Sequence, residues 1–179
     1  AVKLVSPAAL HKTEVGGVAL NLADAPAVSA AAAAMAQRLK AATPAAEISG
    51  FLVQEMVDGL EVLAGVREDA HYGPFMVVGL GGIFVEVLKD VAIRLLPVDE
   101  ATAREMLQSL RGAALFGAFR GQPERDLDAL VRAIAGLSRI FLDHRPWLSD
   151  LEINPLLVRA KGEGVRAVDV RLVRRGAAS

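Results

Sequence analysis

The sequence contains no cysteine among its 179 residues, which excludes disulfides, thiolate metal ligands and a cysteine nucleophile. A chain without cysteine fits the reducing cytoplasm, where we expect this protein to be located. Neither sign of charge is in excess, because 20 Lys and Arg accompany 21 Asp and Glu for a net charge of −1. A nucleic-acid interface needs a basic excess on one face, so we expect no nucleic-acid partner.

Long hydrophobic runs are also missing, although the mean hydropathy is +0.38. The segment 71–87 has few charges, but it is interrupted by Gly73, Pro74, Gly79, Gly81 and Gly82, so we expect no membrane span. Residues 1–22 carry charges at both ends and no cleavage site of a signal peptide. A composition of 53% hydrophobic and 23% charged residues is typical of a globular domain with a substantial core.

The hydrophobic pattern predicts strands and helices in mixed order. Helices are expected over 26–42, 98–110 and 122–144, with Asp24 and Asp99 as N-caps of the first two. Strands are expected over 2–5, 18–22, 51–57, 61–66, 74–80 and 91–97, and residues 148–173 indicate two more strands joined at Gly162 and Gly164. Asp58 and Gly59 indicate a hairpin between the strands at 51–57 and 61–66. The pattern favours an α+β fold with antiparallel sheets.

The first residues already have the pattern of a strand, and the first residue is Ala1 rather than Met. We interpret the chain as part of a longer polypeptide.

Acidic and amide side chains cluster in the predicted hairpin near the end of the chain. Glu152 and Asn154 are two residues apart in one strand, so they share a face with Asp150. Asp169 lies in the second strand, across the hairpin from Asn154. Such oxygen ligands suit Mg²⁺, which takes one or two carboxylates together with substrate phosphates. The alternative is an ordinary solvated face of a strand.

Two glycine clusters, Gly16 with Gly17 and Gly79 with Gly81 and Gly82, would let backbone amides approach an anion. Neither is a Walker A loop, and each alone is also typical of a bulge or a hairpin turn.

Lys3 is a lone charge in an apolar strand, where it would either contact a phosphate or protect an edge strand. Glu61 enters another apolar strand and could accept a hydrogen bond from a ribose hydroxyl. His11 is followed by Lys12; taken singly, it has the pattern of a structural or solvated histidine.

Four segments together resemble one family. They are KLVSPAALHKTEVGGVALNL from Lys3, GFLVQEMVDGLEVLAGV from Gly50, GPFMVVGLGGIFVEVLKDVAIRLLP from Gly73 and DLEINPLLV from Asp150. In this order they resemble the ATP-grasp module of NDP-forming acyl-CoA synthetases, including the ADP-forming acetate–CoA ligases and the succinyl-CoA synthetase β subunit. The resemblance extends from Lys3 to about Val173.

The resemblance implies an ATP-grasp fold whose two lobes clamp a nucleotide, with residues 1–57 as part of the first lobe and 58–179 as the second. It implies the reaction acyl-CoA + ADP + phosphate ⇌ carboxylate + CoA + ATP, with a phosphohistidine of a CoA-binding domain or subunit as the phosphoryl carrier. The expected ligands are ATP or ADP and Mg²⁺, and the expected state is an oligomer.

The resemblance also implies roles for single residues. Lys3 would contact the nucleotide phosphates near Gly16 and Gly17, and Glu61 would hold the ribose. The backbone of Glu55, Met56 and Val57 would form the hinge and bind adenine. Asn154 and Asp169 would bind Mg²⁺ with Glu152 beside them, Gly79, Gly81 and Gly82 would face the phosphohistidine loop, and His11 would be a second phosphoryl carrier.

The chain departs from the family pattern because the opening segment of the grasp and the CoA-binding part are not in it. The same module also occurs in multidomain lysine acetyltransferases, where it is regulatory and not catalytic. A structural role in subunit contacts without nucleotide is a third alternative. The intact set of Lys3, Glu61, Asn154 and Asp169 favours the ligase.

Overall fold

The computed structural model describes residues 1–7, 16–82, 89–118 and 121–176. The chain divides into two compact units, Ala1–Val57 and Asp58–Ser179, which are described separately below. No helix within these described ranges is both long and apolar enough to cross a membrane.

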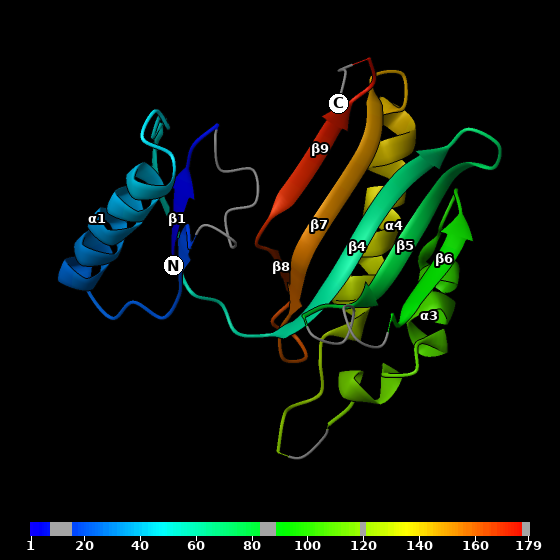
Figure 1. Ribbon diagram of the computed structural model, residues 1–179. Coiled ribbons are helices and arrows are strands. Elements are labelled where there is room, and N and C mark those ends of the chain that lie inside the picture. Colours follow the sequence, from blue (N-terminus) through cyan, green and yellow to red (C-terminus); the bar gives the residue numbers. More distant parts are fainter. Residues whose placement is uncertain (8–15, 83–88, 119–120, 177–179) are drawn as a thin grey trace. The chain divides into compact units, whose positions relative to one another are not determined.

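The first unit is a three-stranded antiparallel sheet with one helix against it (Figure 1). Its strands are β1 (Val2–Val5), β2 (Val18–Ala19) and β3 (Gly50–Val53), in the order β2-β1-β3. Helix α1 (Ala25–Ala42) begins at Asp24, whose side chain accepts a hydrogen bond from the N–H of Ala27 at 2.9 Å, as the sequence predicted. Its Met35 and Leu39 pack against Val2 and Leu4 of β1.

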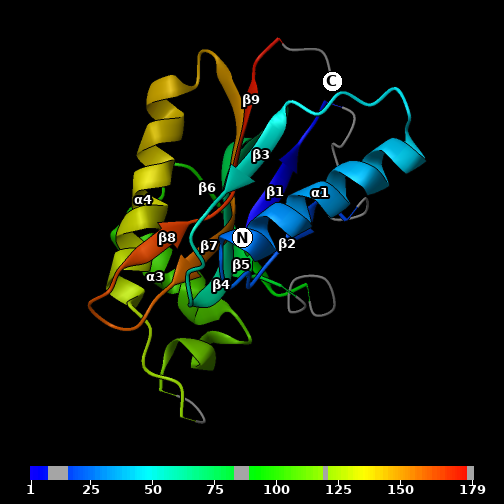
Figure 2. The ribbon, with the colours of Figure 1, turned by 90° about the vertical axis from the view of Figure 1, so that its left-hand side faces the viewer.

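The second unit is an antiparallel sheet in the order β6-β5-β4-β7-β8, with β9 also paired to β7. The strands are β4 (Leu60–Asp69), β5 (Gly73–Leu80), β6 (Val91–Leu95), β7 (Leu148–Val158), β8 (Val165–Ala167) and β9 (Val170–Arg174). Two helices, α3 (Glu100–Ser109) and α4 (Leu127–His144), lie on the same side of the sheet, and a short 3₁₀ helix, η1 (Ala113–Phe116), lies between them in the chain (Figure 2). Asp99 caps α3 as predicted, since it accepts from the N–H of Thr102 at 2.8 Å.

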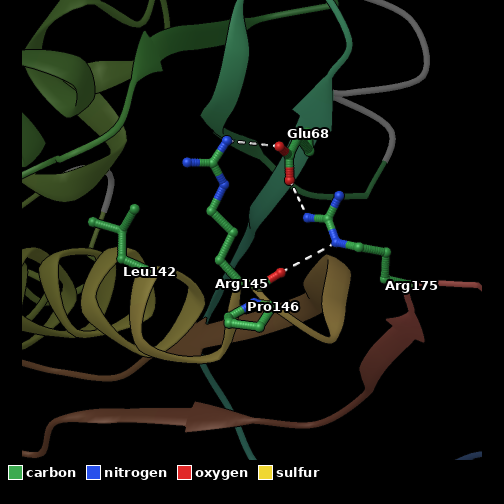
Figure 3. Close-up of a pocket in the computed structure, with 5 residues that line it drawn as sticks. All are labelled: Glu68, Leu142, Arg145, Pro146 and Arg175. Atoms are coloured by element: carbon green, nitrogen blue, oxygen red, sulfur yellow. Dashed lines mark hydrogen bonds and ion pairs between the residues drawn. The ribbon is translucent and has the colours of Figure 1, made fainter.

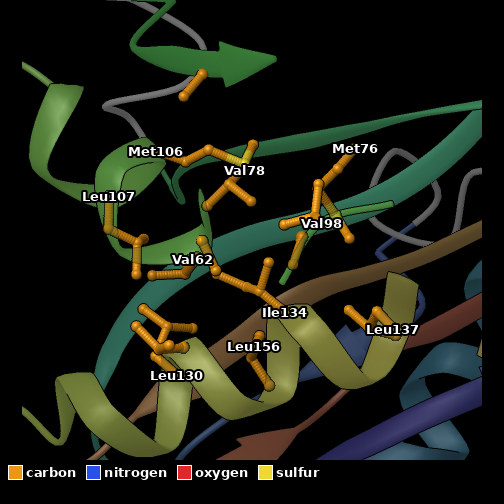
Figure 4. Close-up of a cluster of buried hydrophobic side chains, with 14 of the residues drawn as sticks. Val62, Met76, Val78, Val98, Met106, Leu107, Leu130, Ile134, Leu137 and Leu156 are labelled. Atoms are coloured by element: carbon orange, nitrogen blue, oxygen red, sulfur yellow. The ribbon is translucent and has the colours of Figure 1, made fainter. Parts of the chain in front are cut away.

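The core of the second unit lies between these helices and one face of the sheet (Figure 4). Alternate residues of β4 and β5 point into it because successive side chains of a strand leave opposite faces. Helix α4 contributes an apolar stripe at helical spacing. The fully buried residues include Val62, Val66, Met76, Val78, Met106, Leu130, Ile134, Phe141 and Leu156.

The predicted hairpin at Asp58 and Gly59 is wrong. The strand before it pairs with β1 in the three-stranded sheet, whereas β4 pairs with β5 and β7 in the other sheet. Asp-Gly is a local turn signal, and here the long-range pairing of the flanking strands overrides it. Residues 54–59 therefore connect the two units.

The turn at Gly162 and Gly164 is present, with both glycines at positive φ of 87° and 81°. The strand that follows is divided into β8 and β9, with Val168 and Asp169 between them.

Candidate functional site

One face of the six-stranded sheet carries no described helix of its own unit, and Figure 1 views the sheet from this side. We call it the open face. Val62, Ala64 and Val66 of β4 point to the core, so their neighbours in the strand point to the open face. The alternation and the pairing register place on it Glu61, Leu63, Gly65, Arg67, Val77, Gly79, Asp150, Glu152, Asn154, Asp169 and Arg171.

Asn154 and Asp169 lie opposite each other in this sheet. Ile153 pairs with Val170 and Leu156 with Ala167, so the register continues across the break between β8 and β9. The N–H of Asn154 donates to the carbonyl oxygen of Asp169 at 3.0 Å. Directly opposed residues project from the same face with Cβ atoms about 5 Å apart, so both side chains leave the open face together.

The strand β7 is irregular at this point. Its pairing with β4 shifts between Ala64 and Val62, so Asn154 and Pro155 oppose the single residue Leu63. Such a bulge bends a strand and re-aims a side chain, and bulges are frequent next to functional sites. Asn154 and Asp169 are both exposed, and an amide with a carboxylate is a donor set suited to Mg²⁺ with water and phosphate as further ligands. Within the described ranges, no group of three His, Asp or Glu side chains gathers as a metal site.

Glu61 begins the open face in β4 and contacts two of the predicted glycines. The N–H of Gly81 donates to the carbonyl oxygen of Glu61 at 2.7 Å. A Cβ at Gly81 would lie 2.7 Å from the Cβ of Glu61, and a Cβ at Gly82 would lie 3.0 Å from Oε2 of Glu61. Glycine at these two positions therefore makes room for the glutamate side chain.

A different close contact explains why residue 79 is a glycine. A Cβ there would lie 2.8 Å from the carbonyl oxygen of Asp90 and 2.8 Å from Cγ1 of Val91 in the neighbouring strand. Val91 therefore packs over Gly79, and the small residue permits this pairing. Whether Gly79, Gly81 and Gly82 also face a phosphohistidine loop stays a prediction.

Two arginines on the open face were not predicted from the sequence. Nε of Arg67 donates to Asp150 at 2.7 Å, and Nη2 of Arg171 donates to Asp150 at 3.0 Å and to Glu152 at 3.2 Å. Glu152 thus has a guanidinium partner in addition to its position next to Asn154. The overlooked signal was the spacing, because Arg171 follows Asp169 by two residues and shares its face.

In the first unit, Lys3 lies in the central strand of its sheet, between Val18 of β2 and Leu52 of β3. Protection of an edge strand is therefore wrong as an explanation of this lysine. Val2 and Leu4 are buried against α1, so Lys3 projects from the opposite face.

Gly16 and Gly17 of the first unit accept hydrogen bonds from α1 and β1. Gly17 accepts a hydrogen bond from the N–H of Leu4 at 2.8 Å, and Gly16 accepts one from Nη2 of Arg38 at 3.0 Å. Gly16 has a φ of 62°, which favours glycine. His11 lies outside the described residues, so its predicted role is not tested.

The predicted hinge residues lie in the segment between the two units. Glu55 and Met56 are exposed and belong to no strand. Just before them, Gln54 donates its N–H to the carbonyl oxygen of Ala1 at 2.9 Å and accepts from the Ala1 ammonium at 2.8 Å.

A depression with a volume of about 490 Å³ lies at the end of α4 and is lined by Glu68, Leu142, Arg145, Pro146 and Arg175 (Figure 3). Oε1 of Glu68 accepts from Arg145 at 2.7 Å, and Oε2 accepts from Arg175. These bonds, first that from Arg145 and then that from Arg175, hold the pKa of Glu68 below its ordinary value. Glu68 of β4 thus links Arg145, just after α4, to Arg175, just after β9, which is a structural role.

Nearly the whole chain is similar to known proteins of one family. A family model described as an ATP-grasp domain matches residues 1–173. The β subunit of an ADP-forming acetate–CoA ligase II of Pyrococcus furiosus is 35% identical over 98% of this chain and 75% of its own length. An ADP-forming acetate–CoA ligase I of Archaeoglobus fulgidus is 36% identical over 96% of this chain but only 25% of its own length. The chain thus spans three quarters of the Pyrococcus β subunit and a quarter of the Archaeoglobus ligase.

Solved structures of similar sequence share the fold. A dinucleotide-forming acetyl-coenzyme A synthetase of Ca. Korarchaeum cryptofilum, in complex with coenzyme A and Ca-AMPCP, has a TM-score of 0.88 and 35% identity over 97% of this chain and 75% of its own. A second structure of that enzyme, with a TM-score of 0.81, 29% identity and coverage of 98% and 76%, holds Mg-AMPPCP. In it the phosphohistidine segment points towards the nucleotide-binding site.

Proposed function

Because this chain belongs to the ATP-grasp domain family, with ADP-forming acetate–CoA ligases among its relatives, we propose that it is the nucleotide-binding and phosphoryl-transfer module of an ADP-forming acyl-CoA ligase. The complete enzyme would interconvert acyl-CoA, ADP and phosphate with carboxylate, CoA and ATP. The observation that carries the proposal is the opposed pair of Asn154 and Asp169 on the same open face as Glu61.

The proposed roles follow the order of residues on the open face. Glu61 would accept from a ribose hydroxyl, and the side chains of Asn154 and Asp169 would hold Mg²⁺. When bound, this ion would neutralise phosphate charge. In the first unit, Lys3 would donate to phosphate oxygens, and the backbone of Glu55–Val57 would bind adenine.

The proposal requires a partner. The donor of the phosphoryl group would be a phosphohistidine of the CoA-binding domain or subunit, as the ligand-bound relative suggests. This partner would be fused to the module or supplied by a separate subunit, since the relatives include both arrangements. Because the module would assemble with this partner, we expect the complete enzyme to be an oligomer.

The test is Mg²⁺-dependent nucleotide binding in the complete ligase that contains this chain. We expect calorimetry to give tighter ADP binding with Mg²⁺ than with EDTA, and Asp169→Asn to abolish that difference, since it removes a carboxylate ligand. Asp143→Asn is the matched control, because Asp143 is an exposed carboxylate on α4. Binding of ADP that ignores Mg²⁺ in the wild type, or a wild-type Mg²⁺ effect in Asp169→Asn, would contradict the proposal.

A further inference from the structure

Arg67 and Arg171 form a pair of guanidinium groups on the open face, joined by one buried carboxylate. The side chain of Asp150 is 13% exposed and accepts from Nε of Arg67 at 2.7 Å and from Nη2 of Arg171 at 3.0 Å. A carboxylate with so little access to water needs cationic partners, so it fixes both guanidinium groups beside it.

Both arginines keep donors that Asp150 does not use. Arg171 makes its bonds to Asp150 and Glu152 with Nη2 alone, and Arg67 makes its bond with Nε alone. The other guanidinium nitrogens donate to none of the described residues. The side chains are 57% and 51% exposed, so these nitrogens can meet a ligand.

The exposed ion pairs leave the arginines available. An ion pair with a half-exposed guanidinium contributes about 0–1 kcal/mol, so Arg171 can share or exchange its contact with Glu152 at low cost. A phosphoryl group offers three oxygens in a geometry that guanidinium matches with paired hydrogen bonds.

The arginines lie next to the proposed metal ligands and a hollow in the sheet. Arg171 follows Asp169 by two residues, and Glu152 precedes Asn154 by two, a step of about 7 Å along each strand. The hollow has a volume of about 150 Å³. It is lined by Leu63, Gly65, Val66, Arg67, Val77, Asp150, Leu151 and Glu152.

The order of residues along β4 indicates which part of a bound nucleotide would lie near Arg171. In β4, Glu61 comes first after the segment that joins the units, then Leu63 opposite the bulge at Asn154, then Gly65 and Arg67. A nucleotide with its ribose at Glu61 and its phosphates at Asn154 and Asp169 would therefore have its terminal phosphoryl group on the side of Arg171 and the hollow.

We propose that Arg171, assisted by Arg67, is a catalytic residue that binds the phosphoryl group during its transfer between a phosphohistidine and ADP. This inference rests on the proposed function. In the transfer, the bond from phosphorus to the imidazole nitrogen breaks and leaves its electron pair on nitrogen, while a terminal oxygen of ADP forms the new bond to phosphorus. The guanidinium groups stay protonated and stabilise the charge on the equatorial oxygens.

The test uses the complete ligase with Arg171→Gln, Arg171→Lys and Arg67→Gln. Calorimetry measures the affinity for ADP and for AMPPCP, each with Mg²⁺, and rapid quench measures phosphoryl transfer from the phosphorylated enzyme to ADP. Arg94→Gln is the matched control, because Arg94 is an exposed arginine of the same sheet, opposite Met76 and hence on the other face.

We expect Arg171→Gln to slow the transfer by about 10²-fold and to weaken AMPPCP binding by about tenfold, with ADP affinity unchanged. Arg67→Gln should have a smaller effect of the same kind, Arg171→Lys should recover only part of the rate, and Arg94→Gln should match the wild type. If Arg171→Gln unfolds, Arg171→Lys and Arg67→Gln test the inference instead. Each should slow the transfer and weaken AMPPCP binding while ADP affinity stays unchanged.

Three results would overturn the inference. Unchanged transfer and AMPPCP binding in the arginine variants would exclude contact with the phosphoryl group. An equal loss of ADP and AMPPCP affinity would assign the arginines to support of the metal site instead. A wild-type enzyme that binds no ADP would reject the proposed function itself, and the inference with it.

Discussion

Gly81 leaves no space for a side chain, because a Cβ there would lie 2.7 Å from the Cβ of Glu61 and 3.0 Å from its backbone carbon. We expect Gly81→Ala to lower the free energy of unfolding by about 1–3 kcal/mol, since the backbone on one side must shift. Urea unfolding of the purified protein measures this change. The same shift would move Glu61 and weaken ADP binding.

Gly136 is the matched control for this substitution. It lies inside α4, and a Cβ there would meet no atom within 4 Å. We expect Gly136→Ala to raise the free energy of unfolding by about 0.5–1 kcal/mol, because alanine loses less chain entropy in a helix. Equal effects of the two substitutions would contradict the close approach at Gly81.

His11 carries a prediction that comes from the resemblance alone. A neutral imidazole is nucleophilic near pH 7, and Lys12 beside it would attract phosphoryl oxygens. We expect His11→Ala in the complete ligase to block ATP formation while acyl-CoA and phosphate still label the partner histidine. Radiolabelled phosphate measures both steps. An undiminished rate of ATP formation would show that His11 is not a carrier.

At the scale of elements, Asp126 connects α4 to the hairpin between β7 and β8. Its carboxylate accepts from the N–H of Ala129 at 3.0 Å at the start of the helix, and from Gly162 at 3.0 Å and Gly164 at 2.9 Å in the turn. The bond from Ala129, then those from the two glycines, lower the pKa of Asp126. This hairpin leads directly to Asp169.

The lowered pKa predicts a pH dependence of stability. A carboxylate with a depressed folded pKa stabilises the protein fully above its unfolded pKa of about 3.9, and this contribution is lost as the pH falls through the folded pKa. We expect Asp126→Ala to cost about 2 kcal/mol at pH 7 in urea unfolding, and less at pH 3. Asp143→Asn on the same helix should change stability little at either pH. A pH-independent loss in Asp126→Ala would contradict the role of the charge.

The sequence predicted those elements whose signals are local. Asp24 and Asp99 marked the starts of two helices. The glycines at 162 and 164 marked a turn, and counting residues on either side of it places Asn154 opposite Asp169. The pairing of β3 was not predictable in this way, since its partner β1 lies more than 40 residues earlier in the chain. Arg67 was missed for the same reason, because Arg67 and Asp150 meet only after β4 pairs with β7.

At the scale of the whole molecule, residues 54–59 join two units that each have a hydrophobic cluster of their own. Gln54 is tied to Ala1, and β4 begins at Leu60. Between them, the N–H groups of Glu55, Met56 and Val57 donate to no acceptor in the described parts of the chain. Such a segment opens locally at little free-energy cost, so its amides should exchange quickly with solvent.

The amides of Glu55–Val57 allow a test of adenine binding in the complete enzyme. If adenine binds to the backbone of Glu55–Val57, Mg-ADP gives these amides a partner and slows their exchange, by about tenfold or more at saturation. Hydrogen exchange followed by mass spectrometry measures the peptide that contains them. Mg²⁺ with inorganic triphosphate is the control, because it carries the phosphates without the base and should leave this peptide unchanged. If calorimetry shows ADP bound while the peptide exchanges as in the free enzyme, the base lies elsewhere and the hinge assignment is wrong.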